Sequence, residues 1–335
     1  MIEKKIQTFK VLMVTSFTLW KEFGISVAAP YFIKNIIFKG DHVVGRWFHK
    51  RQYESIKNVV RYKYSSKIEE FIRRASTKNT EKIGKNIWMI WWQGIDQKTP
   101  KTIIQNVRRI KQLHPNWNIN LITKYNYMEF VDIPEHMEYH IRNNDFSMTH
   151  ISDYLRIVVL EKYGGVYLDC NFFLLESMNY VLQYPFYTIK HGTVSEWHVS
   201  KGLWTTGFLA AGRKNILFSF LKEMYEAYFL DYSFVPSYFF IDAIIGLGYE
   251  NIGAVTKEID FVPYNNKHYN FINLRGNDLF NYEIWNSVVS DTCVFNVNYK
   301  NCFSYEKNGE LTFFGYLYMK YERENKCCSG IERGK

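Results

Sequence analysis

The chain of 335 residues is long enough to bury one large core, or one domain with a helical appendage. Hydrophobic residues make up 47% of it and aromatic residues 18%, which excludes an intrinsically disordered protein. The net charge of +9 favours anionic partners, namely nucleotide-sugars, anionic lipid head groups or nucleic acid. Because no nucleic-acid-binding module appears, nucleic acid ranks last and we expect no such partner.

The first 80 residues are predicted to form a basic helical extension. Apolar residues at intervals of three and four define one stripe of a helix: Ile6, Phe9, Met13, Phe17 and Trp20. The apolar stretch at residues 11–20 is too short to span a bilayer, and a basic segment follows at residues 39–67. This pattern is typical of a peripheral contact with anionic membranes. The alternative is that these helices pack on the following domain or on a second subunit.

The next predicted elements are a strand, a helix and a second strand. A linker-like stretch at residues 75–80 precedes the first strand, which we place at residues 87–92. Thr99 is the predicted N-cap of the helix, with Pro100 at its first position. The second strand is predicted at residues 117–123. This βαβ opening is typical of the nucleotide-binding half of an α/β fold.

The centre of the chain, residues 147–174, predicts a helix, a stop and a buried strand. Ser147 is a good N-cap, because its hydroxyl can accept a hydrogen bond from the first turn. Gly164 and Gly165 are expected to end the helix, since glycine adopts the left-handed conformation without a Cβ penalty. The apolar run at residues 166–168 then predicts a short central strand.

Polar residues of this unit are spaced so that they can meet at one edge of the sheet. Asp153 and Arg156 are three apart and share one helix face. Asp169 and Asn171 close the strand two apart, so their side chains are expected on the same side of the pleat. These groups suit a ribose hydroxyl, a diphosphate and a divalent cation such as Mn²⁺ or Mg²⁺. The alternative is an ordinary Rossmann-like helix with surface charges.

The string SDYLRIVVLEKYGGVYLDCN, residues 152–171, is similar to the SD-x-x-R…YGG-x-Y-x-D-x-D signature of glycosyltransferases with the DXD sugar-binding motif. Within that group the chain resembles bacterial capsular polysaccharide synthesis glycosyltransferases, relatives of the yeast initiating α-mannosyltransferase and the clostridial glucosylating toxins. The upstream IWMIWWQG, residues 87–94, matches the opening strand of the same families. The resemblance covers about residues 85–300. Asn171 departs from the motif, because many members have a second aspartate there.

The resemblance implies a GT-A-like fold, an α/β/α sandwich around a mostly parallel sheet, to which the N-terminal helical extension is added. It implies that Trp91 stacks on the uracil ring of a UDP-sugar; the alternative is that Trp91 belongs to the core. Asp153 and Arg156 would hold the ribose and the donor sugar, while Asp169 and Asn171 would hold Mn²⁺ or Mg²⁺ on the diphosphate. Relatives retain the anomeric configuration, so we expect retention here.

Two further groups of candidates lie downstream of the signature. Related enzymes shape the donor-sugar and acceptor pocket with the region around residues 201–210, so Trp204, Thr205 and Thr206 are candidates. Asp242 lies within an apolar run, and a buried carboxylate needs partners. It is either an acceptor-site carboxylate or a structural one whose hydrogen bonds are satisfied.

The sequence therefore predicts a metal-dependent, retaining hexosyltransferase that acts on a lipid-linked oligosaccharide or polysaccharide acceptor, a capsule or exopolysaccharide unit. Its predicted catalytic residues are Asp169, Arg156 and Asp242. Three domains are predicted: a helical extension at residues 1–80, a catalytic domain at 81–305 and a C-terminal segment at 306–335. Two alternatives stay open, a non-catalytic sugar- or lipid-binding scaffold of a polysaccharide assembly complex and a toxin-like protein glycosyltransferase.

The expected location is the cytoplasm, at the inner face of the cell membrane. The five cysteines form no paired C-x-x-C pattern, and an odd number is a poor disulfide framework, so we expect reduced thiols. The N-terminal lysines before an apolar run resemble a signal peptide. However, Lys21 and Glu22 follow that run at once, and no small-residue cleavage site adjoins it.

Overall fold

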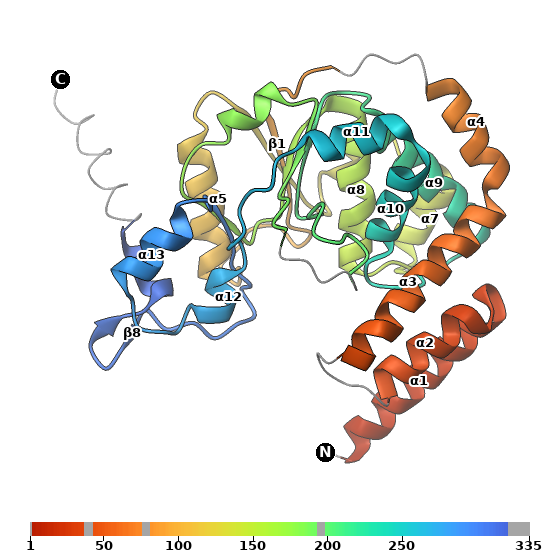
Figure 1. The fold of residues 1–335 in the computed structure, drawn as a ribbon, viewed down its shortest axis with the longest axis horizontal. Coiled ribbons are helices and arrows are strands. Elements are labelled where there is room, and N and C mark those ends of the chain that lie inside the picture. The colour runs from red at the N-terminus through yellow and green to blue at the C-terminus, as the bar shows by residue number, and fades with distance from the viewer. Residues whose placement is uncertain (1, 37–42, 76–80, 193–197, 321–335) are drawn as a thin grey trace.

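A computed structural model describes residues 2–36, 43–75, 81–192 and 198–320 (Figure 1). The helices are α1 (Ile2–Phe23), α2 (Ile25–Ile36), α3 (Val43–Lys63), α4 (Ser65–Ala75), α5 (Lys101–Leu113), α6 (Tyr127–Phe130), α7 (Glu135–Arg142), α8 (Met148–Tyr163), α9 (Ile216–Asp231), α10 (Phe240–Asn251), α11 (Gly253–Phe261), α12 (Phe271–Arg275) and α13 (Tyr282–Val289), with a 3-10 helix at Asn179–Gln183. The strands are β1 (Asn86–Ile90), β2 (Asn118–Ile122), β3 (Gly165–Leu168), β4 (Phe172–Leu174), β5 (Phe186–Thr188), β6 (Phe208–Ala211), β7 (Val294–Asn296), β8 (Glu306–Lys307) and β9 (Glu310–Leu311). The predicted linker lies outside the described residues, apart from the last residue of α4.

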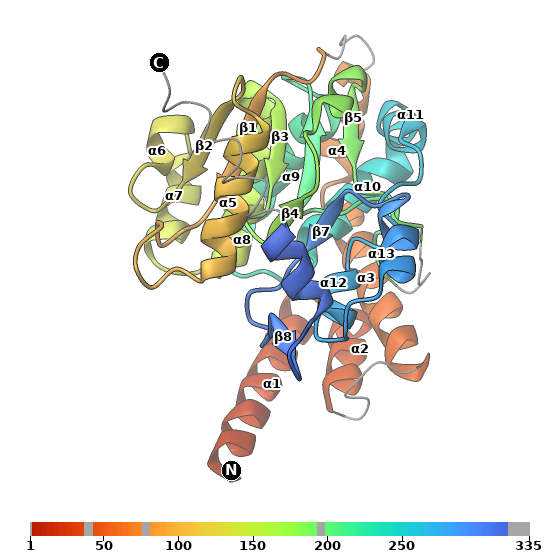
Figure 2. The ribbon, with the colours of Figure 1, turned by 90° about the vertical axis from the view of Figure 1, so that its left-hand side faces the viewer.

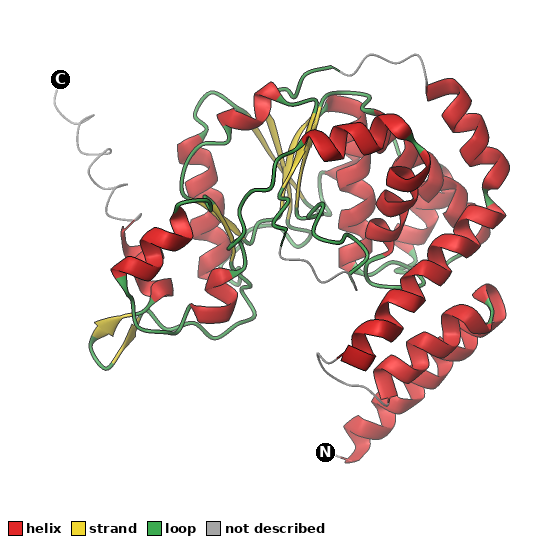
Figure 3. Ribbon diagram, in the orientation of Figure 1, coloured by secondary structure: helices red, strands yellow, loops and turns green. Residues whose placement is uncertain are grey.

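A five-stranded mixed sheet, ordered β2-β1-β3-β6-β5, forms the centre of the fold. β2, β1 and β3 run parallel, whereas β6 is antiparallel to both of its neighbours. β1, α5 and β2 form the predicted βαβ unit. α5 lies on one side of the sheet and α8, α9 and α10 on the other, which gives three layers (Figure 3). The predicted α/β fold with an N-terminal helical extension is confirmed.

α8 and β3 follow one another as predicted, because a capped helix ends at two glycines. The Ser147 hydroxyl accepts a hydrogen bond from the backbone N–H of His150 and caps α8. Gly164 and Gly165 have positive φ angles of 64° and 105°. A Cβ on Gly165 would lie 2.4 Å from the carbonyl oxygen of Asn86. Only glycine therefore lets β3 start this close to β1.

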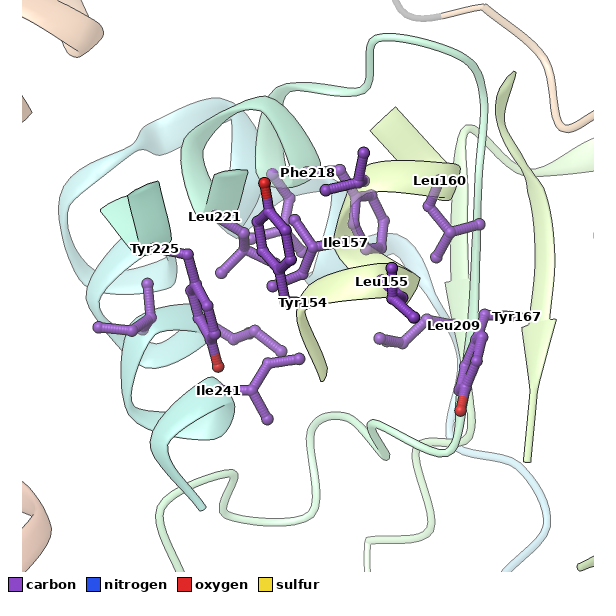
Figure 4. Packing of buried hydrophobic residues seen from close by; sticks show 14 of the residues in the cluster. Tyr154, Leu155, Ile157, Leu160, Tyr167, Leu209, Phe218, Leu221, Tyr225 and Ile241 are labelled. Carbon is purple, nitrogen blue, oxygen red and sulfur yellow. The ribbon is translucent and has the colours of Figure 1, made fainter. Parts of the chain in front are cut away.

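The main core covers both faces of the sheet and includes buried residues of α1 to α5 as well as of α8, α9 and α10. Figure 4 shows its part around α8, α9 and α10, with Tyr154, Leu155, Ile157 and Leu160 of α8, Tyr167 of β3, Leu209 of β6, Phe218, Leu221 and Tyr225 of α9, and Ile241 of α10. Residues 153–160 of α8 are all buried, including Asp153 and Arg156. These two charges are thus enclosed by the fold, and the alternative of surface charges on an ordinary helix is wrong.

A second, smaller core lies beside the sheet. β4 pairs antiparallel with β7, and α12, α13 and residues 313–318 pack around this pair. Its buried residues are Phe173, Phe271, Ile272, Trp285, Val288, Phe295, Val297, Phe313, Phe314, Leu317 and Tyr318. The Tyr318 hydroxyl donates a hydrogen bond to Asn106 of α5 at 2.8 Å, which links the two cores. The predicted domain boundaries stay predictions.

The N-terminal extension consists of α1 to α4, and α1 extends away from the body of the molecule (Figure 2). Residues of its predicted apolar stripe are 45–61% exposed: Ile6, Phe9, Met13, Phe17 and Trp20. Leu19 and Phe23 lie on the buried side of the same helix. Within the described residues, no helix combines the length and the apolar character that crossing a membrane requires.

The predicted boundaries of β1, β2, β3 and α5 differ from the observed ones by one or two residues. β1 ends at Ile90, so Trp91 follows the strand instead of lying within it. α5 has Pro100 at its N-cap position, one residue later than predicted. The Thr99 hydroxyl accepts a hydrogen bond from the backbone N–H of Asp96 at 2.9 Å instead of capping the helix. Turn geometry in the preceding loop thus outweighs the capping preference of threonine.

Candidate active site

The carboxyl ends of β1 and β3 lie side by side at one edge of the sheet, because the two strands are parallel neighbours. Asp169 follows β3 at this edge, and its backbone N–H donates to the carbonyl oxygen of Gly207 at 2.9 Å. A Cβ on Gly207 would lie 2.6 Å from Asp169 Oδ2, so any larger residue there would displace the carboxylate. The side chain of Asp169 keeps 34% of its surface exposed. Its carboxylate can therefore reach a ligand.

Arg156 holds the polar residues of this edge together. Its Nη2 lies 3.2 Å from Asp153 Oδ1 and 3.7 Å from Asp169 Oδ1. Its Nη1 donates to the carbonyl oxygen of Thr206 at 2.8 Å, and its Nε donates to that of Ser152 at 3.2 Å. The structure thus brings Asp153, Arg156 and Asp169 together. Because protein groups engage every guanidinium nitrogen, Arg156 positions its neighbours.

Tyr167 completes this group, although its place in the apolar strand and in the matched signature predicts no role for its hydroxyl. Its hydroxyl donates to Asp169 Oδ1 at 2.6 Å. The guanidinium carbon of Arg156 lies 4.4 Å from the centroid of its ring, within the range of a cation–π contact. The available signal is a tyrosine two residues before an aspartate on an extended segment. We call Asp153, Arg156, Tyr167 and Asp169 the sheet-edge cluster.

Asp153 is buried, and one of its two carboxylate oxygens has no hydrogen-bond partner among the described residues. Its Oδ1 faces Arg156, whereas its buried Oδ2 has no hydrogen-bond partner among the described residues. Burial raises the pKa of Asp153 to about 7, and the Arg156 guanidinium partly offsets this rise. Buried polar atoms in proteins are nearly always hydrogen-bonded, so Asp153 Oδ2 is an acceptor that still lacks a donor in the part of the chain that the structure describes.

Asn171 lies in a turn after β3. The prediction that the side chains of Asp169 and Asn171 lie on the same side of one strand is therefore wrong. β3 ends at Leu168, and the backbone N–H of Phe172 donates to the carbonyl oxygen of Asp169 at 3.0 Å. The pleat therefore does not align Asp169 with Asn171. Asn171 Nδ2 donates to Oδ1 of Asn296 on β7 at 2.9 Å. Its own Oδ1 is buried and has no hydrogen-bond partner in the described part of the chain.

The sheet edge offers only a few oxygen atoms that could coordinate a cation. In the ranges that the structure describes, no three His, Cys, Asp or Glu side chains are grouped so that they could hold a metal ion. Asp169 nevertheless offers an accessible carboxylate, and Asn171 offers a carbonyl oxygen without a partner. These oxygen donors fit a hard divalent cation, since Mg²⁺ is commonly held by one or two carboxylates together with substrate phosphates.

Trp91 is the first residue after β1, at the same edge of the sheet. Its backbone N–H donates to the carbonyl oxygen of Ile122 at 3.0 Å. Its half-buried ring makes an edge-to-face contact with Tyr299, with centroids 5.4 Å apart. The ring is thus neither fully in the core nor freely exposed, and stacking on a base stays a prediction.

A cavity of about 1080 Å³ lies between the main core and the second core. Residues 200–206 and α10 contribute to one side, and residues 267–275 and α13 contribute to the other. Its lining includes all four candidates from the downstream segments: Trp204, Thr205, Thr206 and Asp242. Thr206 connects the cavity to the sheet-edge cluster, because its carbonyl oxygen accepts from Arg156. The two groups of predicted residues therefore adjoin each other.

Asp242 lies in the first turn of α10 and is buried in the wall of this cavity. Its Oδ1 accepts a hydrogen bond from the indole Nε1 of Trp204 at 2.9 Å. Burial raises the pKa of Asp242 to about 7; the Trp204 hydrogen bond lowers it and the Asp153 carboxylate raises it. Asp242 thus has the partner that a structural carboxylate needs, and it also faces a space large enough for a ligand.

The family model described as capsular polysaccharide synthesis protein matches residues 41–317. The chain belongs to this family. It is also similar to the O-glycosyltransferase braB of Annulohypoxylon truncatum, with 23% identity over 175 residues, which are 48% of this chain and 40% of that protein. The chain therefore matches less than half the length of this relative. Among solved structures, the PaToxG glycosyltransferase covers 82% of this chain and 95% of its own, at 16% identity and a TM-score of 0.35.

Proposed function

We propose that this protein is a retaining glycosyltransferase that moves a sugar from a UDP-sugar to a capsular or exopolysaccharide acceptor. The observation that carries this proposal is the sheet-edge cluster, in which one guanidinium joins Asp153 and Asp169 beside a large cavity. Open α/β sheets bind nucleotides at the carboxyl ends of their strands. Family membership supports the same activity, and the relative braB is named an O-glycosyltransferase.

The donor is assigned to the sheet edge. Asp153 Oδ2 accepts a hydrogen bond from a ribose or sugar hydroxyl, since this buried oxygen has no other partner among the described residues. Arg156 acts through Asp153 and Asp169, and its charge also favours the nearby diphosphate. Trp91 stacks on the uracil ring at the end of β1. All of these groups lie at the edge of the sheet where the carboxyl ends of β1 and β3 meet.

Asp169 and Asn171 would hold Mn²⁺ or Mg²⁺ through one carboxylate and one carbonyl oxygen. When bound, the cation supplies positive charge that stabilises the departing nucleoside diphosphate. Tyr167 and Arg156 keep the Asp169 carboxylate oriented by contacts to its Oδ1. Asn296 does the same for Asn171 by accepting from its amide nitrogen.

The acceptor is assigned to the cavity, where Asp242 and the residues 204–206 lie. The acceptor hydroxyl forms its bond to the anomeric carbon on the face from which the nucleoside diphosphate departs, so configuration is retained. The proton of that hydroxyl passes to the departing phosphate oxygen. Asp242 orients the hydroxyl by accepting its hydrogen bond, while the indole of Trp204 fixes the carboxyl group.

The test is a thermal-shift screen of UDP-sugars with Mn²⁺, followed by measurement of UDP release without acceptor. A bound donor should raise the melting temperature, because a ligand of the native state stabilises it by RT ln(1 + [L]/Kd). Asp169→Asn should lose both signals, whereas the control Asp132→Asn, at an exposed ion pair with Lys162, should keep them. A UDP-sugar that binds but is never hydrolysed or transferred would favour a sugar-binding scaffold.

We also propose that α1 binds anionic membranes peripherally. Its apolar stripe is exposed, and Lys10 and Lys21 lie on the same helix, a combination suited to an interfacial helix. Phosphatidylserine vesicles should sediment with the chain in a salt-sensitive manner, and the double variant Phe17→Ser, Trp20→Ser should reduce this. Loss of a dimer in that variant, with vesicle binding unchanged, would instead assign the stripe to a second subunit.

A further inference from the structure

α3 joins the N-terminal extension to the helix that carries Asp242. The N-cap residue of α10 is Phe239, whose side chain makes no capping hydrogen bond. The backbone N–H of Phe239 instead donates to the hydroxyl oxygen of Tyr53 on α3, at 3.1 Å. The same hydroxyl is hydrogen-bonded to the side chain of Ser237. A residue far away in the sequence thus satisfies a polar group at the start of α10 that the helix cannot satisfy itself.

The start of α10 also forms part of the cavity wall. Phe239 and Asp242 both line the cavity, and they are separated by less than one helical turn. The Tyr53 ring packs on the Phe239 ring, with centroids 6.0 Å apart. Tyr53 itself is 2% exposed and does not line the cavity. A displacement of this turn would therefore move an aromatic wall residue and the buried carboxyl group together.

Lys57, one turn further along α3, contacts the other end of α10. Its buried amino group forms ion pairs with Glu250, near the end of α10, and with Glu54 at 3.1 Å. A Cβ on Gly246 would lie 3.5 Å from Lys57 Cδ and 3.9 Å from the Trp204 ring. Lys57 and Trp204, the partner of Asp242, thus both lie near α10 at Gly246, at distances that leave room for a Cβ. α3 holds α10 at both ends.

We propose that Tyr53 is a positioning residue, which sets the place of Phe239 and Asp242 in the acceptor cavity. α3 is then part of the active-site architecture, whether α1 contacts a membrane or a second subunit. The kinetic consequence of this assignment rests on the proposed glycosyltransferase function. The structural consequence, an α10 whose first turn depends on the Tyr53 hydroxyl, does not.

The structural arm of the test compares amide hydrogen exchange in Tyr53→Phe with that in Tyr64→Phe. Tyr64 is a matched control, because it follows α3, is also buried, and donates its hydroxyl hydrogen bond to Asp231 on α9 at 2.7 Å. Peptides that span residues 237–245 should exchange about tenfold faster in Tyr53→Phe, the usual effect of one lost hydrogen bond. The control should leave these peptides unchanged. Equal exchange in the two variants would overturn the proposal.

The kinetic arm uses a panel of p-nitrophenyl glycosides as acceptor probes. Tyr53→Phe should raise the acceptor KM about tenfold and should affect sugar transfer more than UDP release without acceptor. Ser237→Ala should act in the same direction and add little to Tyr53→Phe, because both remove one hydrogen-bonded pair. A parallel fall of transfer and UDP release would overturn the positioning role. If the wild type releases no UDP at all, the proposed function fails, while the exchange comparison still decides whether Tyr53 holds the start of α10.

Discussion

Asp153 and Arg156 of the sheet-edge cluster and Asp242 in the cavity wall are all buried polar groups, but they are stabilised by different means. Arg156 compensates the charges of Asp153 and Asp169 directly, and backbone carbonyls satisfy the rest of its guanidinium. Asp242 has a neutral partner, the indole of Trp204. Burial raises the pKa of both Asp153 and Asp242 to about 7, so both carboxyl groups titrate near neutrality. The difference lies in the partner, because Asp153 contacts a permanent cation and Asp242 contacts a neutral donor.

The two regions also have different tolerances to substitution. In the sheet-edge cluster, loss of one member leaves buried charges without compensation. At Asp242, a neutral side chain of the same shape can keep the Trp204 hydrogen bond. The following variants use this contrast, in order of decreasing effect.

Arg156→Ala should have the largest effect, because it removes the cation shared by the sheet-edge cluster. Breaking a buried ion pair typically costs about 3–5 kcal/mol of the free energy of unfolding. Arg213→Ala is the control, since Arg213 pairs with Glu81 at an exposed site where about 0–1 kcal/mol is expected. Urea unfolding followed by circular dichroism measures both. Similar losses in the two variants would mean that Arg156 does not stabilise the cluster.

Asp169→Ala should lower UDP release by about 100–1000-fold, the usual cost of removing one group that stabilises developing charge. Excess EDTA should have a comparable effect, and electron paramagnetic resonance should detect less bound Mn²⁺ in the variant. Asn171→Ala should cost less, because water can replace a neutral carbonyl ligand. Asn171→Asp should keep activity and lower the Mn²⁺ concentration for half-maximal rate. Full activity in EDTA, or a wild-type rate for Asp169→Ala, would refute the metal assignment.

Three members of the sheet-edge cluster, Asp153, Arg156 and Asp169, were predictable because they belong to one helix–strand unit. The spacing of Asp153 and Arg156 defines a helix face, and Asp169 follows the strand. The orientation of Asn171 was not predictable, since its amide partner is 125 positions away. The Trp204–Asp242 pair, 38 positions apart, and the Tyr53–Ser237 pair, 184 apart, likewise form only on folding. Local periodicity carries no information about such contacts.

Trp91→Ala tests whether the sheet edge also binds the base. It should weaken UDP binding by about 1–3 kcal/mol, the usual contribution of an aromatic ring stacked on a base. Trp91→Phe is the matched control, because it keeps an aromatic face and should lose less. Isothermal titration calorimetry measures both affinities. Unchanged UDP affinity in a folded Trp91→Ala variant would assign Trp91 to packing against Tyr299.

Asp242→Asn tests the carboxyl group whose partner is neutral. The pKa of Asp242 is raised in the folded state from an ordinary value near 3.8 to about 7, chiefly by burial. Between these two values the folded state binds a proton that the unfolded state has released. The contribution of Asp242 to stability is therefore complete below pH 4 and is lost as the pH rises towards 7, at about 1.4 kcal/mol per pH unit.

Asparagine cannot titrate, yet its carbonyl oxygen can still accept from Trp204. The free energy of unfolding of Asp242→Asn, measured by urea titration from pH 4.5 to 8, should therefore decline less steeply than that of the wild type. Asp153 leaves a residual slope in both proteins, because burial raises its pKa as well. This change in the free energy of unfolding, per pH unit, is smaller than the loss expected for Arg156→Ala. In the described part of the chain, Asp242 has no cationic partner to lose, because a bound proton neutralises its carboxyl group. Parallel pH profiles for the two proteins would mean that Asp242 stays ionised, and its charge would then need compensation like that at the sheet edge.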